Sequence, residues 1–252
     1  GIKIAHLHSG ETTLGAIDNI YRHCITLASA LCFTSTEKYS KRVNAITDNQ
    51  IPAFNIGALS LDGIENLELP SKEDLTKRFD LDFSKPLILI VFHPETVSPE
   101  SNLSYITELL AGIDMLPEYS YAINLPNMDT NADIIRQAIL DYKSKNQSNK
   151  SITVVEHFGK RNYFSCLKHS ALLIGNSSSG IIEAASFNKH VVNVGNRQKG
   201  RAQSKNIINA DFNFVDILNA INTCIKLGHY KGENIYYKEH TARIIVKKIK
   251  EL

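Results

Sequence analysis

LILIVF, residues 87–92, is a run of six consecutive apolar residues. A strand that is apolar on both of its faces needs helices on both sides of its sheet. Similar short apolar runs alternate with amphipathic stretches along the rest of the chain, which predicts an α/β protein with a doubly wound parallel sheet. The predicted strands are Ile2–Leu7, Leu31–Thr34, Ala53–Ile56, Leu87–Phe92, Tyr119–Ile123, Ile152–Val155, Ala171–Ile174, His190–Val194 and Asn206–Ile208. The predicted helices are Ile17–Ala30, Glu37–Ala45, Lys72–Phe79, Ser101–Met115, Ala132–Lys143, Asn162–His169, Ile181–Phe187 and a last one within Tyr236–Leu252.

The predicted strands fall into two groups on either side of the polar stretch Gly57–Lys85. The six strands after it are enough for one complete Rossmann-like domain. The three strands before it would leave much apolar sheet uncovered, so they predict the second half of another α/β domain. We therefore predict residues 1–57 as this partial N-terminal domain, residues 58–235 as a C-terminal nucleotide-binding domain, and residues 236–252 as a helix that packs back on the first domain. The chain opens on a strand without a Met, so we expect further residues upstream.

Composition excludes several classes of protein. The 252 residues carry 28 Lys+Arg against 26 Asp+Glu, a net charge of +2, and 43% are hydrophobic. This balance is typical of a globular domain and argues against a nucleic-acid partner. No stretch has the length of a membrane span or the pattern of a signal peptide, so we expect no membrane partner. The four cysteines form no CxxC pair, which predicts reduced thiols in a cytoplasmic protein.

A Gly/Ser-rich turn, GNSSSG at residues 175–180, follows the predicted strand Ala171–Ile174. Free backbone N–H groups at a helix start, with small hydroxyls beside them, suit a phosphate or diphosphate. Glu183, in the first turn of the predicted helix, is placed to accept hydrogen bonds from the two hydroxyls of a ribose. The turn therefore predicts a nucleotide-diphosphate site; the alternative is a serine that caps a plain helix.

Three more strand ends carry candidate ligand contacts. The stretch GNRQKGR at residues 195–201 follows the next strand, and its cations, Arg197 among them, either clamp phosphates or form a solvated basic loop. His93 follows the strand Leu87–Phe92, where a histidine donates to phosphate, relays a proton or has a structural role. Asn127 and Asp129 follow another strand, and Asn127 either contacts a base or sugar or opens a turn.

Glu11 and Asp18 form a candidate acid–base pair. Glu11 ends the stretch HLHSGE that begins at residue 6, and Asp18 precedes a predicted helix that carries Arg22. Two carboxylates in a closed cleft can have their pKa values pushed apart. The competing interpretation makes Asp18 a helix N-cap with Arg22 as its i+4 partner. His6 and His8 of the same stretch lack a third ligand, so we expect no metal site.

Together these stretches resemble one family, the hydrolysing UDP-N-acetylglucosamine 2-epimerases of bacterial sialic acid biosynthesis and their relatives that act on diacetylated 6-deoxy sugars. The matching residues keep one order along almost the whole chain. They are HLHSGE at 6–11, Asp18 with RHCIT at 22–26, TSTE at 34–37, NIG at 55–57, FHPET at 92–96, Asn127 with Asp129, GNSSSG at 175–180 with Glu183, and GNRQKGR at 195–201.

The resemblance implies two Rossmann-like domains that face a cleft, the GT-B arrangement, of which the first is only partly present. It implies an enzyme that eliminates UDP across C1–C2 of UDP-N-acetylglucosamine or a related UDP-2-acetamido sugar, and then adds water with inversion at C2. The products are UDP and a free N-acetylmannosamine-type sugar, and no cofactor is needed. The same resemblance leads us to expect a dimer or tetramer.

The resemblance also implies roles residue by residue. Glu11 and Asp18 match acidic residues that transfer protons, and His93 matches a histidine on the diphosphate side. Ser9 stands where the family often has Gly, so we expect a slightly different local backbone. The residues that match the UDP-binding set or its serine run are Asn127, Ser177, Ser178, Ser179, Glu183 and Arg197.

Two motifs of the family, a Gly-Ser/Thr-Arg-Ala loop and a Gly-Asp-Arg motif, do not occur in these 252 residues. Because the Asp and Arg of the second motif belong to the family's active site, we expect these residues alone to be inactive. Three alternatives stay open at this point. They are a UDP-binding fragment without catalysis, a GT-B glycosyltransferase and a non-hydrolysing 2-epimerase.

Overall fold

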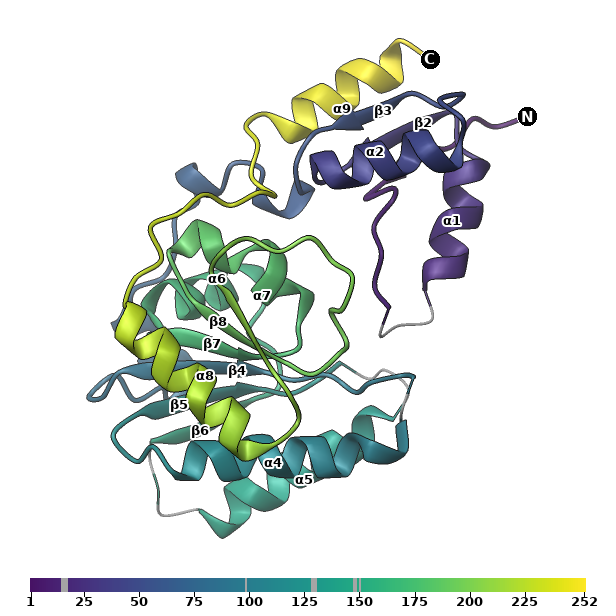
Figure 1. Ribbon diagram of the computed structural model, residues 1–252. Helices are drawn as coiled ribbons and strands as arrows, with labels where there is room; N and C mark the ends of the chain where they lie inside the picture. The colour runs from purple at the N-terminus through teal and green to yellow at the C-terminus, as the bar shows by residue number, and fades with distance from the viewer. Residues whose placement is uncertain (15–17, 98, 128–130, 147–148, 150) are drawn as a thin grey trace.

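The computed structural model describes residues 1–14, 18–97, 99–127, 131–146, 149 and 151–252. Within these residues two parallel sheets form, and they lie in separate parts of the molecule (Figure 1). The first has the order β1-β2-β3, with β1 at Ala5–Leu7, β2 at Leu31–Thr34 and β3 at Ala53–Asn55. The second has the order β6-β5-β4-β7-β8-β9, with β4 at Leu87–Val91, β5 at Ser120–Asn124, β6 at Ile152–Val155, β7 at Leu172–Gly175, β8 at Val191–Val194 and β9 at Ile207–Ala210. Each predicted strand overlaps one of these, and the predicted α/β class is confirmed.

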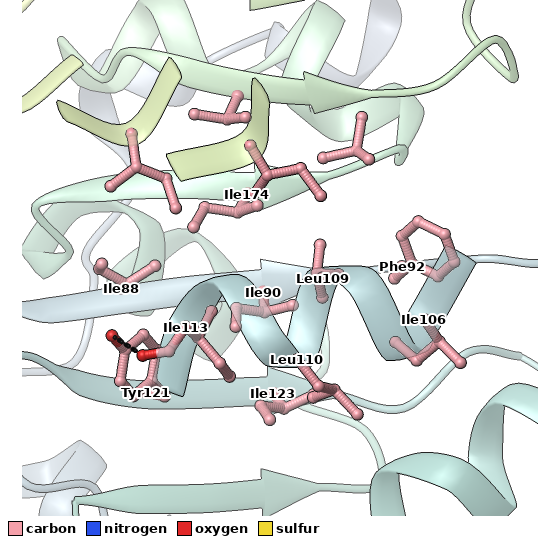
Figure 2. Close-up of a cluster of buried hydrophobic side chains, with 14 of the residues drawn as sticks. Ile88, Ile90, Phe92, Ile106, Leu109, Leu110, Ile113, Tyr121, Ile123 and Ile174 are labelled. Atoms are coloured by element: carbon pink, nitrogen blue, oxygen red, sulfur yellow. Dashed lines mark hydrogen bonds between the residues drawn. The ribbon is translucent and has the colours of Figure 1, made fainter. Parts of the chain in front are cut away.

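The six-stranded sheet is covered by helices on both faces, as the apolar strand β4 requires. Ile88 and Ile90 face one layer, where Figure 2 shows them beside side chains of α4, and the same buried cluster includes side chains of α5 and α8. Leu87, Leu89 and Val91 face the opposite layer, which contains residues of α3 and α6. Each of these side chains is at most 4% exposed, and burying one stabilises the fold by about 1.5–3 kcal/mol. The helices are α1 at Asn19–Leu27, α2 at Glu37–Ile46, α3 at Lys72–Phe79, α4 at Asn102–Asp114, α5 at Ala132–Lys145, α6 at Lys160–His169, α7 at Ser178–Ile182, α8 at Phe214–Leu227 and α9 at Thr241–Lys250.

Helix α8 was not predicted, although the sequence carries its signals. The Asn213 side chain caps it by accepting from the Asp216 N–H at 2.9 Å, and Gly228 follows its last residue. Its buried face follows a helical period through Ile217 and Ile221. This helix completes the cover over β8 and β9, with which it makes extensive contacts.

The helix after β7 begins earlier than predicted. Helix α7 starts at Ser178 rather than at Ile181, because the Ser177 side chain accepts a hydrogen bond from the Ser179 N–H at 3.3 Å. Glu183 therefore lies at the C-terminal end of α7, where a short 3-10 turn, η4 at Ala184–Phe187, continues the chain. The prediction that Glu183 occupies the first helical turn is wrong.

Helix α9 lies against the three-stranded sheet, beside β3 (Figure 1). Ile245 of α9 packs in a cluster with Leu31, Phe33 and Ile56. At the start of α9, the Thr241 hydroxyl donates to the Ile56 carbonyl at 2.6 Å. The chain thus returns from the six-stranded sheet to the first sheet, while the exact domain boundaries stay a prediction.

Large apolar side chains are exposed on β1, α1 and the residues just before β1. Ile2 is 97% exposed, and Ile20 and Tyr21 are 66% and 65% exposed. Strand β1 is also an edge of its sheet, with β2 as its one neighbour among the described residues. Exposed apolar side chains on this scale are typical of a contact surface. None of the helices in the described residues is long and apolar enough to cross a membrane.

Candidate active site

A cavity of about 390 Å³ lies where the carboxyl ends of four neighbouring strands meet. These strands are β4, β5, β6 and β7, the centre and one side of the six-stranded sheet. Six of the nine predicted site residues line it: His93, Asn127, Ser177, Ser178, Ser179 and Glu183. Ligands of open parallel sheets bind at this edge, so the cavity is the candidate active site.

The connection from β6 to α6 and the first turn of α6 contribute residues that sequence reasoning missed. His157, Phe158, Lys160 and Tyr163 all line the cavity. They add aromatic side chains and a cation to the lining, and the Tyr163 phenol interacts with Ser179 of the serine run. Their signal was available, because they follow the predicted strand Ile152–Val155 and so reach the same sheet edge as the other candidates.

Asn176 joins the loops that follow β4 and β7. Its side chain is fully buried, accepts from the His93 N–H at 2.7 Å and donates to the His93 carbonyl at 2.8 Å. Its own carbonyl accepts from the Gln198 side chain at 2.8 Å and from Arg197 Nη1 at 3.3 Å. Three loops, after β4, β7 and β8, are therefore held together at one buried residue.

A second buried residue, Glu95, connects the loops after β4 and β8. It is 4% exposed, and its carboxylate accepts from the Asn196 N–H at 3.0 Å. Burial raises the pKa of Glu95, although this hydrogen bond, one from the Arg197 backbone and the Arg197 charge oppose that rise. Arg197 itself does not line the cavity. Its guanidinium donates to the carbonyl of Asn176, the residue just before the cavity-lining Ser177.

Glu183 is a buried carboxyl at the inner wall of the cavity, 8% exposed. The Ser60 hydroxyl, from the segment between the two sheets, donates to it at 2.6 Å. Burial raises the pKa of Glu183, and the hydrogen bonds of Ser60 and Ser179 and the charges of Lys160 and His8 oppose that rise. A carboxylate in this position can accept hydrogen bonds from ligand hydroxyls.

Glu11 lies outside the cavity lining and is enclosed by three partners. It is 3% exposed; Oε1 accepts from His8 Nδ1 and from the Ser35 hydroxyl, each at 2.7 Å, and Oε2 accepts from Arg201 Nη1 at 2.8 Å. Burial alone would raise the pKa of Glu11, but the His8 hydrogen bond and the Arg201 charge outweigh it and lower the pKa to about 2. Glu11 is therefore a carboxylate at neutral pH.

Asp18 is 57% exposed and forms an i+4 ion pair with Arg22 at 3.3 Å. It occupies the N-cap position of α1 without a side-chain capping bond. The structure gives no contact between Asp18 and Glu11, so the predicted acid–base pair is not brought together in the described residues. Asp129 lies outside the described residues. In the described part of the chain, no group of three or more His, Cys, Asp or Glu side chains is arranged to hold a metal ion.

The chain is similar in sequence to known proteins. The sequence profile described as UDP-N-acetylglucosamine 2-epimerase matches residues 1–250. A Campylobacter jejuni GDP/UDP-N,N'-diacetylbacillosamine 2-epimerase (hydrolyzing) is 37% identical over 215 residues, 85% of this chain and 56% of that protein. The Escherichia coli polysialic acid biosynthesis protein P7 is 33% identical over 255 residues, 99% of this chain and 64% of that protein. The chain thus spans less than two thirds of the length of these relatives.

Solved structures show the same fold at low sequence identity. The Neisseria meningitidis UDP-GlcNAc 2-epimerase bound to UDP-GlcNAc superposes with a TM-score of 0.79 at 17% identity, covering all of this chain and 70% of that one. S. aureus MnaA, solved with UDP, superposes with a TM-score of 0.80 at 16% identity over 99% of this chain and 68% of that one. With the profile match over nearly every residue, the chain belongs to the UDP-N-acetylglucosamine 2-epimerase family.

Proposed function

We propose that this chain is the nucleotide-binding part of a hydrolysing 2-epimerase that releases UDP from UDP-N-acetylglucosamine or a related UDP-2-acetamido sugar. The observation that carries the proposal is that six predicted site residues line one and the same cavity at the carboxyl edge of the sheet. The hydrolysing form is supported by the name of the Campylobacter jejuni relative. The UDP-sugar is supported by the ligand of the Neisseria meningitidis structure. Cytoplasmic location and assembly into a dimer or tetramer stay predictions.

We propose that the cavity holds the UDP moiety. Ser177, Ser178 and Ser179 line the cavity together with Lys160, whose cation would attract the diphosphate. Arg197 stands beside this space and would stabilise the charge that develops on UDP as it leaves. Glu183 would accept hydrogen bonds from the two ribose hydroxyls.

The proposed chemistry needs a proton acceptor at C2 of the sugar. As the C2–H bond breaks, its electron pair forms the C1–C2 double bond and the C1–O bond to UDP breaks. Water then adds across the double bond, with hydroxyl at C1 and a proton on the opposite face of C2. Because Glu11 is ionised at neutral pH, it can accept the first proton. The second proton arrives on the opposite face of C2, so a different group has to donate it.

The test is product analysis by NMR in deuterated water. The protein as it is expressed from its gene is incubated with UDP-N-acetylglucosamine and, separately, with the UDP-diacetamido sugar. We expect UDP and a free sugar that carries deuterium at C2, and no turnover by the 252 residues alone. A product that is still UDP-linked would favour a non-hydrolysing epimerase, and transfer to an added acceptor would favour a glycosyltransferase. UDP binding without turnover of either sugar by the expressed protein would leave a binding module.

UDP affinity is expected to depend on the ionisation of Glu183. Because burial raises the pKa of this carboxyl, it becomes protonated as the pH falls from neutrality towards its ordinary value of 4.5. A protonated carboxyl accepts less well from ribose hydroxyls, so UDP should bind more weakly at about pH 5 than at about pH 7.5. At the higher pH, Glu183→Gln should weaken binding about tenfold.

Calorimetric titration of both proteins with UDP at the two pH values measures this effect. The UDP phosphate also titrates in this range, but it does so equally for both proteins, so the ratio of their affinities isolates Glu183. The groups that face Glu183 are Ser60, Ser179, Lys160 and His8. An affinity ratio that stays constant with pH would show that Glu183 does not contact UDP.

A further inference from the structure

The loop Gly195–Arg201 follows β8 of the six-stranded sheet. This loop and the residue just after it also form hydrogen bonds with the part of the molecule that contains the three-stranded sheet. The Leu14 N–H donates to the Lys199 carbonyl at 2.8 Å, and the Ala202 N–H donates to the Tyr39 hydroxyl of α2 at 2.8 Å. Tyr236, on the segment that returns to the first sheet, donates from its hydroxyl to the Ala202 carbonyl at 2.8 Å. The backbone that carries Arg201 is therefore fixed against the three-stranded sheet, although it belongs to the connection between β8 and β9.

Arg201 reaches Glu11 across the boundary between the two sheets. The pair is 2.8 Å long, and the side chains of Arg201 and Glu11 are 7% and 3% exposed. His8 and Ser35 bind the other carboxylate oxygen. A buried carboxylate with both oxygens engaged by directed donors is fixed in orientation as well as in charge.

The turn that carries Glu11 lies directly against α2. Gly10 has a φ of +76°, and a Cβ on it would stand 2.7 Å from the Tyr39 carbonyl oxygen. The backbone of this turn has no room to move towards α2. The direction of the Glu11 side chain therefore depends on its three partners, of which Arg201 is the one supplied by the nucleotide-binding part.

The other end of the same loop is attached to the cavity. Gln198 and Arg197 both donate to the carbonyl of Asn176, the residue that precedes the serine run. His8, which donates to Glu11, also acts through its charge on Glu183 in the cavity wall. A continuous set of contacts thus links the nucleotide cavity to Glu11.

We propose that Arg201 is a positioning residue for proton transfer, which crosses from the nucleotide-binding part to aim the Glu11 carboxylate at the sugar. The proposal rests on the proposed function, because it takes Glu11 to be the group that accepts the C2 proton. A single loop then places Arg197 beside the leaving UDP and Arg201 on the proton acceptor. The carboxylate is correctly oriented when the two sheets are correctly placed relative to one another.

The first test uses the 252-residue chain and separates this proposal from the proposed function. Glutamate-labelled NMR follows the titration of Glu11, and calorimetry measures UDP affinity. In Arg201→Gln the pKa of Glu11 should rise by more than about one unit, while UDP affinity stays within about twofold because Arg201 does not line the cavity. Absence of UDP binding by the unmodified chain would overturn the proposed function. An unchanged Glu11 pKa with intact UDP binding would overturn the role of Arg201 alone.

The second test measures turnover by the protein as it is expressed from its gene. Arg201→Gln should lower kcat about 10- to 100-fold with KM within about threefold, and Arg201→Lys should recover part of kcat by restoring the charge without the forked geometry. The matched control is Lys205→Gln, which removes an exposed cation from the same connection and should change neither constant. If Arg201→Gln does not fold, Ser35→Ala removes another donor to Glu11 and should lower kcat in the same way. A kcat within about twofold of the unmodified enzyme in the folded variant would refute the positioning role.

Discussion

Replacing Asn176 with Ala is expected to lower the free energy of unfolding by about 3 kcal/mol and to weaken UDP binding at least tenfold. The truncation leaves the N–H and the carbonyl of His93 without the partners that hold them at 2.7 and 2.8 Å. Each main-chain group stranded away from water costs about 1–3 kcal/mol. The loops after β4 and β7 would also lose their common anchor, so His93 and the serine run would no longer be held in one arrangement. Urea denaturation gives the first quantity, and calorimetric titration with UDP gives the second.

The matched control for this prediction is Asn206→Ala. Asn206 is also fully buried, and its side chain donates to the Lys189 carbonyl at 2.9 Å, but it precedes β9 at the opposite edge of the sheet. Its loss should destabilise the fold by about 1–2 kcal/mol and leave UDP affinity unchanged. If Asn176→Ala binds UDP as well as the control does, Asn176 stabilises the fold without organising the cavity.

The fold could be predicted because the central strands of the six-stranded sheet are buried on both faces. A buried parallel strand such as β4 has to be apolar at every position, and this composition is visible without knowledge of what packs on it. The position of the cavity could be predicted from one rule, that ligands bind beyond the carboxyl ends of the strands. That rule alone brings His93 and the serine run to the same place, although 83 residues separate His93 from Asn176.

Contacts between the two sheets could not be predicted in this way. Glu11 and Arg201 are 190 residues apart, and their ion pair depends on how one sheet is placed against the other. Sequence reasoning interpreted the cations of the Gly195–Arg201 loop as a phosphate clamp or a solvated basic loop, whereas Arg201 forms a buried ion pair with Glu11. Glu95 was also unassigned, because its partner Asn196 follows another strand of the same sheet and lies 101 residues away. Pattern and spacing within one segment carry no information about such pairs.

Gly175→Ala is expected to have the largest effect on stability, a loss of about 4 kcal/mol in the free energy of unfolding, together with loss of UDP binding. Gly175 has a φ of +140°, and a Cβ on it would stand 1.9 Å from the carbonyl oxygen of Val91. That oxygen belongs to β4, the strand paired with β7, so it cannot move without breaking the sheet. Because Gly175 immediately precedes Asn176 and the serine run, any shift that relieves the clash displaces the cavity wall. Urea denaturation with fluorescence detection, followed by titration of the folded fraction with UDP, measures both effects.

Gly63→Ala separates steric conflict from backbone strain. Gly63 has a φ of +70°, but no atom lies within 4 Å of the Cβ that Ala would add. This variant should lose only about 1 kcal/mol, the cost of placing an alanine in the left-handed region, and should bind UDP normally. If both variants were destabilised equally, the clash with Val91 would be absorbed by the structure, and the close approach of β7 to β4 would not be what requires glycine at position 175. A larger loss in Gly175→Ala would show that the serine run is held in place by the contact between these two strands.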